Sequence, residues 1–174
     1  MINELIKEIG IALQKDCWFV ALNTALTLPD ICGKAEYPAY GQKQRYVKWL
    51  NRYGRLHFDN LIQVSDIYNL RCCMIHQGTP STKQKGKNIE EFELIVNTYE
   101  QSNVTEEALY MAPDKYVLSV NVLHICRLLC SAAKTYYDSN KEKFDFFKYR
   151  VVSVDYGTAK TFTKAKDTFK ISFD

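Results

Sequence analysis

Apolar residues recur every three or four positions through residues 2–28, with polar residues between them. The members of this repeat include Ile2, Leu5, Ile6, Ile9, Leu13, Cys17, Val20 and Ala21. This spacing puts the apolar side chains on one face of an α-helix, so the pattern predicts a long first helix. We expect Pro29 to break or restart it, because proline removes a backbone donor and crowds the preceding turn. Segment 34–41, KAEYPAYG, carries turn residues and is expected to be a loop.

Two shorter helical segments follow, and a glycine stands at the end of each. The first covers about 42–53, and Gly54 is expected to end it because glycine readily adopts the conformation that closes helices. The second covers about 61–77, where Gly78 followed by Pro80 is a strong stop signal.

The pattern changes after Pro80, where β-branched and aromatic residues replace the helical repeat. Residues 92–99, FELIVNTY, predict a strand. The pattern over 105–120 is ambiguous and is compatible with another short strand. The helical repeat returns over 120–137, and FFKYRVVSV at 146–154 predicts a last strand.

Together these segments predict a mainly α fold, a bundle of about four to five helices with a small β insertion and a C-terminal strand and tail. The length of 174 residues fits one domain. We assign residues 1–155 to that domain and residues 156–174, which show little periodicity, to a polar C-terminal tail.

Composition places the chain among globular proteins, because 47% hydrophobic content is enough to bury a core. A net charge of +3 is too small to identify a partner. The amphipathic start, MINELIKEIG, lacks the pattern of a signal peptide. No run of about 18 apolar residues predicts a membrane span. We therefore expect a cytoplasmic protein that does not bind a membrane.

Six cysteines raise the question of metal or redox chemistry. They are Cys17, Cys32, Cys72, Cys73, Cys126 and Cys130. No CxxC pair is present, and the last two have helical spacing with His124 nearby. Small buried hydrophobes on helix faces explain this pattern, so no metal or cofactor is expected. The alternatives are a metal site and a redox sensor built on the adjacent pair at 72–73, whose side chains a helix would direct apart.

An arginine followed five positions later by a histidine occurs twice, and the spacing alone is a weak signal. Arg52 and His57 flank Gly54, on backbone that is expected to be irregular. Arg71 and His76 share one predicted helix. Over five residues an ideal helix rises about 7.5 Å and turns about 140°. The two side chains therefore meet only if arginine bends, the last turn loosens, or a two-fold dimer brings two pairs into one cleft.

A purely structural interpretation of the second pair is also open. Arg71 would form an ion pair with a carboxylate, and His76 would cap the C-terminus of the helix, where a cation suits the helix dipole. Neither side chain would then take part in chemistry.

Three stretches, ALTLPDICGKAEYP, RYVKWLNRYG and DIYNLRCCMIHQG, together resemble small prokaryotic proteins of the HEPN superfamily (higher eukaryotes and prokaryotes nucleotide-binding domain). Its signature is an arginine and a histidine with four to six residues between them, near the end of the third helix of a small helical domain. The likeness covers residues 1–137 in the order of elements and 66–78 in a specific motif. It implies a metal-independent endoribonuclease, usually dimeric, of toxin–antitoxin, anti-phage or CRISPR-linked type.

On this resemblance, Arg71 and His76 match the catalytic arginine and histidine of the motif. Asn69 and Asp66 fall where the family often places a supporting polar residue. The implied partners are RNA, a second copy of the chain, and an antitoxin or regulatory protein.

The chain departs from the family at two positions. The residue after the arginine is often polar in the family and is Cys72 here. In the toxins paired with minimal nucleotidyltransferases a tyrosine follows two positions after the histidine, where this chain has Gly78. Regulation by modification of that tyrosine is therefore not expected. The departures leave open a second hypothesis, a catalytically inactive HEPN-like module that binds nucleotide, RNA or a partner protein.

The two residue types suit RNA cleavage without a metal. RNA supplies its own nucleophile, the 2′-OH, so the protein needs to move protons and stabilise charge on phosphorus. Histidine exchanges protons near neutral pH, and arginine stays charged and can bind two phosphate oxygens. The expected products end in a 2′,3′-cyclic phosphate and a 5′-hydroxyl.

Basic residues at two places could follow a phosphate backbone. Those spaced along one side of the predicted second helix are Arg45, Lys48, Arg52 and Arg55. Those that follow the motif helix are Lys83, Lys85 and Lys87. Aromatic residues beside the first set could stack on bases, namely Tyr46, Trp49 and Tyr53. The alternative is a solvated charged face whose aromatic residues belong to the core.

Overall fold

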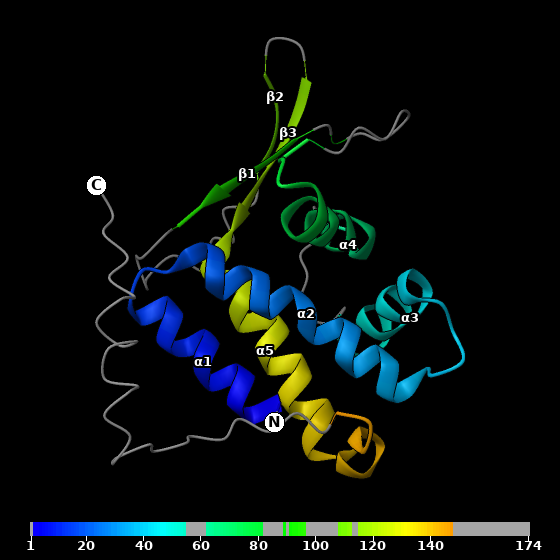
Figure 1. The fold of residues 1–174 in the computed structure, drawn as a ribbon. Helices are drawn as coiled ribbons and strands as arrows, with labels where there is room; N and C mark the ends of the chain where they lie inside the picture. Colours follow the sequence, from blue (N-terminus) through cyan, green and yellow to red (C-terminus); the bar gives the residue numbers. More distant parts are fainter. Residues whose placement is uncertain are drawn as a thin grey trace, which may run out of the picture.

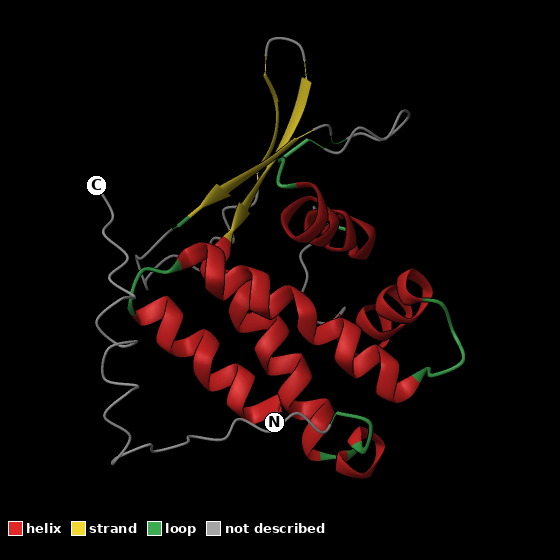
Figure 2. Cartoon of the chain, in the orientation of Figure 1, coloured by secondary structure: helices red, strands yellow, loops and turns green. Residues whose placement is uncertain are grey.

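The computed structural model describes residues 2–54, 62–81, 89, 91–96, 108–112 and 115–147. Five α-helices are described: α1 (Ile2–Gln14), α2 (Trp18–Glu36), α3 (Gln42–Trp49), α4 (Val64–Cys72) and α5 (Val122–Asp138). Single π turns extend α3 over Leu50–Gly54 and α4 over Cys73–Gln77, and a 3₁₀ turn spans Lys141–Phe144. The predicted mainly α fold is confirmed (Figures 1 and 2).

The core is organised around α2, which packs against α1, α3 and α5 (Figure 1). Buried residues occur on several sides of this helix. They are Ala21, Leu22, Ala25, Leu26, Leu28, Pro29, Cys32 and Gly33. A helix that is apolar on most sides belongs at the centre of a fold, and α2 therefore positions whatever its few polar residues touch.

The long first helix expected over 2–28 is in fact two helices, and this expectation was wrong about where the chain breaks. The break lies at Lys15–Cys17, where Asp16 has a φ of 56°. Aspartate tolerates this left-handed conformation better than most residues. The apolar repeat continues across the break, so the sequence pattern did not reveal it.

Pro29 does not break a helix, contrary to expectation, and lies inside α2, which continues to Glu36. Proline removes one backbone hydrogen bond from a helix interior. Pro29 is buried, and the packing of α1, α3 and α5 around α2 holds the helix together across it. The predicted loop 34–41 therefore begins only at Tyr37.

A close approach between α2 and α3 depends on Gly33. A Cβ atom at this position would lie 2.8 Å from the carbonyl oxygen of Arg45. Real Cβ atoms do not approach backbone this closely, so only glycine allows the two helices to lie at this separation. The predicted helix start at Gln42 is confirmed.

A three-stranded sheet lies beside the helices, with strands β1 (Glu91–Ile95), β2 (Ala108–Ala112) and β3 (Lys115–Asn121) in the order β1-β3-β2. β1 is parallel to β3, and β2 is antiparallel to β3. β1 confirms the strand predicted from residue 92. The ambiguous segment 105–120 supplies two strands, where one short strand was considered.

The last predicted helix is confirmed as α5, which starts directly after β3. The side chain of Asn121 caps it by accepting from the backbone N–H of Leu123 at 3.0 Å and of His124 at 3.3 Å. Of the strand predicted over 146–154, Phe146 and Phe147 are not in a strand, and 148–154 lie outside the described residues. The tail 156–174 also lies outside them.

Among the described residues, no helix has both the length and the apolar character that crossing a bilayer requires.

Candidate functional site

The site residues lie on α4 and the π turn that continues it. The helix begins with a cap in which the carboxylate of Asp66 accepts from the backbone N–H of Gln63 at 3.0 Å. α4 packs against α2 and α3. It ends at Gly78, whose φ of 60° and ψ of 24° are the left-handed closing conformation. The predicted stop at Gly78 is confirmed.

The π turn Cys73–Gln77 brings Arg71 and His76 together. Arg71 Nη1 lies 2.7 Å from His76 Nε2. The backbone N–H of Gly78 donates to the carbonyl of Cys73 at 2.9 Å, a bond that spans five residues. A π turn winds more residues per turn than an α-helix, so residues five apart come close to one face. The rotation of about 140° expected for an ideal helix does not apply here, and a dimer is not needed to bring this pair together.

Asp30 of α2 holds the guanidinium of Arg71 from the other side. Its Oδ2 accepts from Arg71 Nε at 2.7 Å and lies 2.7 Å from Nη2. The two side chains are 7% and 13% exposed, so the ion pair is largely buried. Burial alone would lower the pKa of Arg71, but the Asp30 carboxylate outweighs it and raises that pKa above its ordinary value. Arg71 therefore stays charged.

The contact fixes how His76 can be protonated. Arginine nitrogens only donate hydrogen bonds, so Nε2 of His76 must accept. In the neutral ring the proton is then on Nδ1. His76 is exposed whereas Arg71 is buried. The contacts from Asp30 to Arg71 and from Arg71 to His76 therefore run from the core to the surface.

Sequence reasoning missed Asp30. The structural interpretation did anticipate a carboxylate partner for Arg71, and the structure supplies it 41 positions earlier in the chain. The signal in the sequence was one acidic residue in the apolar run ALTLPDICG. An acid at that place in a central helix requires a buried partner.

The two supporting residues have different positions. Asp66 forms the helix cap. Asn69 is 5% exposed, so its amide does not reach the surface. The structure therefore places Asp66 in the start of the helix and Asn69 in its buried face.

Two basic residues of the predicted stripe, Lys48 and Arg52, have partners within the chain. Lys48 lies 4.8 Å from the ring centroid of Tyr40, and Arg52 pairs with Glu36 at 3.3 Å. Arg45 is half-buried, and its Nε is buried without a hydrogen-bond partner in the described structure. The predicted Lys83, Lys85 and Lys87, and Arg55 of the stripe, lie outside the described residues.

The proposed base-stacking residues are not available for stacking. Tyr46 and Trp49 are fully buried in the core, so this expectation was wrong for both. Tyr53 is half-buried and donates its hydroxyl to Glu36 at 3.0 Å. The alternative, that these aromatic residues belong to the core, is the correct one for Tyr46 and Trp49.

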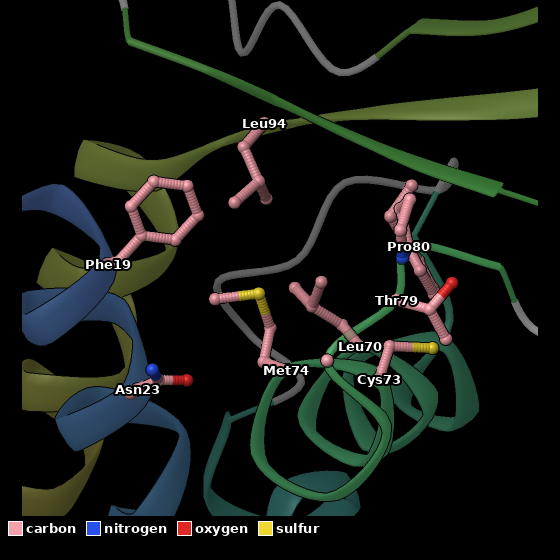
Figure 3. A pocket seen from close by; sticks show the side chains of 10 residues that line it. Phe19, Asn23, Leu70, Cys73, Met74, Thr79, Pro80 and Leu94 are labelled. Atoms are coloured by element: carbon pink, nitrogen blue, oxygen red, sulfur yellow. The ribbon is translucent and has the colours of Figure 1, made fainter.

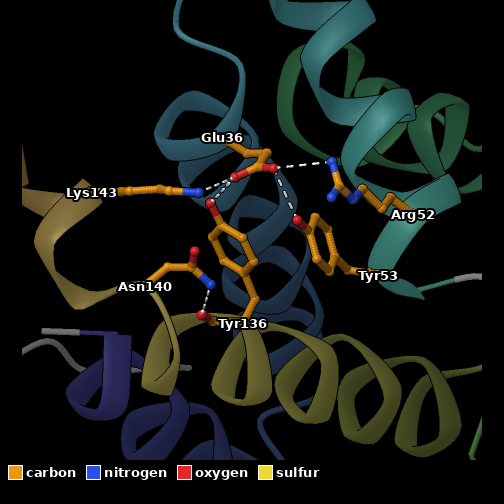
Figure 4. A network of polar contacts seen from close by, with 6 residues as sticks. All are labelled: Glu36, Arg52, Tyr53, Tyr136, Asn140 and Lys143. Carbon is orange, nitrogen blue, oxygen red and sulfur yellow. Dashed lines mark hydrogen bonds and ion pairs between the residues drawn. The ribbon is translucent and has the colours of Figure 1, made fainter.

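Arg52, of the other arginine–histidine pair, also has an acidic partner. Arg52 takes part in a network around Glu36 (Figure 4), where the carboxylate also accepts from Tyr136 at 2.9 Å and Lys143 at 2.6 Å. His57 lies outside the described residues. Arg52 thus has a structural partner of its own.

The cysteines are free, and several are buried in helices. Burial raises the pKa of Cys126 to about 12 and that of Cys130 to about 11, so both thiols stay neutral. In the part of the chain that the structure describes, no three His, Cys, Asp or Glu residues are grouped closely enough to hold a metal ion.

Comparison of the chain with known proteins gives no match to a family model, a curated protein or a solved structure. The HEPN resemblance therefore rests on the motif and the order of elements.

Proposed function

We propose that this chain is a metal-independent endoribonuclease in which Arg71 and His76 act on the scissile phosphate. The observation that carries the proposal is the 2.7 Å contact between Arg71 Nη1 and His76 Nε2. A permanently charged group and a titratable ring thus lie side by side, and the ring is exposed. π turns of this kind occur frequently at functional sites.

The reaction would use the 2′-OH of RNA as the nucleophile. The 2′ oxygen bonds to the adjacent phosphorus while the bond from phosphorus to the 5′ oxygen breaks. A phosphate oxygen first displaces His76 Nε2 as the acceptor at Arg71 Nη1, and Nε2 then takes the proton of the 2′-OH. The 5′ oxygen takes a proton from water. Arg71 stabilises the charge that develops on phosphorus.

Asp30 determines which nitrogen of Arg71 can bind a phosphate. Nε and Nη2 face Asp30, which leaves Nη1 as the nitrogen directed at His76. Arg71 would therefore bind the phosphate through Nη1, and not through the Nε–Nη2 edge that arginine often presents to oxyanions. In return, Asp30 fixes the plane of the guanidinium and with it the place of the phosphate.

The test is cleavage of a labelled RNA and analysis of the ends. We expect a 2′,3′-cyclic phosphate and a 5′-hydroxyl, and no cleavage when the 2′-OH at the cut site is replaced by hydrogen. Cleavage of the deoxy-substituted strand would overturn the proposed nucleophile. If the purified chain cleaves no RNA, the endoribonuclease proposal fails.

A second candidate function is a binding module without catalysis, and one observation favours it. The Arg71 side chain is only 7% exposed, and its ion pair with Asp30 would stabilise the fold even without a substrate. In this case nucleotide or RNA would bind at His76 without being cut. Binding of RNA that survives intact, with affinity reduced in His76→Ala, would support this candidate.

The partners implied by the resemblance remain proposals. The homodimer was also expected from the rotation of about 140° in an ideal helix, a motive that the contact within one chain removes. The homodimer, an antitoxin or regulatory protein, and a toxin or defence role now follow from the HEPN likeness alone. Light scattering at micromolar concentration tests the first of these, and a monomer there would count against the dimer without affecting the cleavage chemistry, because one chain already brings Arg71 and His76 together.

A further inference from the structure

A partly enclosed cavity of about 500 Å³ lies beside the π turn (Figure 3). Phe19 and Asn23 line it from α2, Leu70 and Met74 from the motif helix and its π turn, and Leu94 from β1. Sites for small molecules are commonly concave, mostly apolar and about 300–1,000 Å³ in volume. The cavity has these properties, and neither the Arg71–His76 pair nor the proposed cleavage uses it.

The described walls of the cavity are neutral. None of the described lining residues is charged. Thr79 Oγ1 already accepts from the backbone N–H of Ser81 at 3.3 Å. The thiol of Cys73 lies 3.7 Å from the carbonyl of Ser81, and burial raises its pKa, which keeps it neutral. A charged ligand would find no counter-charge among these residues, so an uncharged ligand fits best.

A buried polar atom of the lining lacks a hydrogen-bond partner among the described residues. Oδ1 of Asn23 is buried and has no hydrogen-bond partner in the described structure. Its amide extends from α2 toward Met74 in Figure 3. A buried acceptor of this kind is unfavourable unless a donor reaches it. A water molecule is a poor donor here, because ordered water needs two to four polar partners and the walls are mostly apolar.

Phe19 stands at the rim of the cavity with 67% of its surface exposed. An aromatic ring so placed could cover a molecule bound beneath it and lose contact with water in the process. The rim therefore offers apolar contact area that the chain itself does not use.

We propose that this cavity binds a small, uncharged, largely apolar molecule that donates one hydroxyl or amine hydrogen to Oδ1 of Asn23. The occupant is a small molecule, not a protein segment, because the space is limited to about 500 Å³ and Asn23, which lines it, carries an acceptor without a hydrogen-bond partner in the described structure. The proposal is independent of RNA cleavage, and the site would exist in a binding module as well.

The test uses N-phenyl-1-naphthylamine, a neutral fluorescent probe with one N–H, titrated against the full chain. We expect saturable binding with enhanced fluorescence. Asn23→Leu should weaken it about tenfold, the effect of one lost hydrogen bond. Phe19→Ala should weaken it as well. Ile11→Ala, which removes an apolar side chain that is 48% exposed on α1 and outside the lining, should leave binding unchanged.

A second probe keeps the test decisive even if a variant folds poorly. The N-methyl derivative of the same amine lacks the donor, and we expect the parent chain to bind it about as weakly as Asn23→Leu binds the original probe. Equal affinity for the two probes would overturn the role of Asn23. Absence of saturable binding, or an oligomer that dissociates in Phe19→Ala, would overturn the small-molecule site, the latter in favour of contact between copies.

Discussion

Two acidic residues of α2, six positions apart, make very different polar centres. Glu36 has a donor pair at each oxygen: Arg52 and Tyr53 at Oε1, Tyr136 and Lys143 at Oε2. Asp30 uses only Oδ2, with Arg71 as its partner, and its Oδ1 is buried without a hydrogen bond in the described structure. Both carboxylate oxygens of Glu36 are therefore hydrogen-bonded. The Asp30 centre leaves one oxygen without a bond among the described residues and ends in the exposed His76.

The two centres also differ in how their groups are held. Around Glu36, burial would raise the carboxyl pKa, but hydrogen bonds from Lys143, Tyr136 and Tyr53 outweigh it and lower that pKa. The same network, with burial as the main cause, raises the pKa of Tyr53 to about 12. The hydrogen bonds of these groups join α2, α5 and the turns that follow α3 and α5. The Asp30 centre instead ends at the exposed ring of His76.

The largest expected effect is on RNA cleavage at the Asp30 centre. His76→Ala should reduce RNA cleavage by about 10²–10⁴, the usual contribution of a positioned proton-transfer group. Its melting temperature should stay close to that of the parent, because His76 is exposed in the last turn before Gly78. Cleavage of labelled RNA and a thermal melt measure the two quantities.

The matched control is His57→Ala, in the other arginine–histidine pair, which should cleave RNA like the parent. Excess EDTA should not inhibit the parent chain either. If His57→Ala abolishes cleavage and His76→Ala does not, the wrong pair has been chosen. Arg71→Ala should lose as much activity as His76→Ala, and stability too, because it leaves Asp30 buried without its partner.

Asp30→Ala tests whether the Asp30 centre also stabilises the fold. It leaves the Arg71 guanidinium buried without a counter-charge, which typically costs about 3–5 kcal/mol. Urea unfolding measures this, and the double variant Asp30→Ala/Arg71→Met should recover part of the loss because it buries no charge. A double variant less stable than Asp30→Ala would show that the ion pair is not the source of the effect.

Glu36→Gln should have a smaller effect, about 2 kcal/mol, because the amide keeps one acceptor and loses the charge-assisted bonds. A carboxyl whose pKa is lowered on folding stabilises the protein fully above its unfolded pKa of about 4.3. That contribution is lost as pH falls through the lower folded value. Urea unfolding between pH 3 and pH 7 should therefore show a weaker acid dependence in Glu36→Gln than in the parent.

The smallest expected effect concerns RNA binding by the basic residues. Lys48 is exposed and lies over Tyr40, so a phosphate can reach its ammonium. Lys48→Gln should weaken RNA affinity and reduce the salt slope by about one released counterion. The combined change of Arg45, Lys48 and Arg52 to Gln should flatten the slope further. An unchanged slope would leave these residues as an ordinary solvated face.

Helix ends that depend on local chemistry could be predicted from the sequence. Those that depend on tertiary packing could not. Gly78 ends its helix as predicted because only a left-handed residue closes it there. Pro29 was misjudged because packing around α2 overrides the local cost of proline. The break at Asp16 was missed because no glycine or proline marks it. Both errors concerned helix boundaries, so the predicted mainly α fold was still correct.

The candidate pair could be chosen from the sequence, but the contact between its two side chains could not be predicted. Arg71 and His76 were chosen from spacing and resemblance, and the structure brings them into contact. The contact itself depends on a π turn, and no local pattern in the sequence CMIHQ predicts that turn. Asp30 was unpredictable as a partner because the ion pair joins residues that are far apart in sequence and meet only through the packing of α2 against α4.

The π turn has one more consequence, for changes in chain length. An ordinary α-helix places residues four apart next to each other, and the π turn does the same for Arg71 and His76, which are five apart. The turn therefore behaves as an α-helix that has absorbed an insertion. Relatives with one residue fewer between the two could keep the same contact in a regular helix, so alignment by fixed spacing would separate chains that share one arrangement.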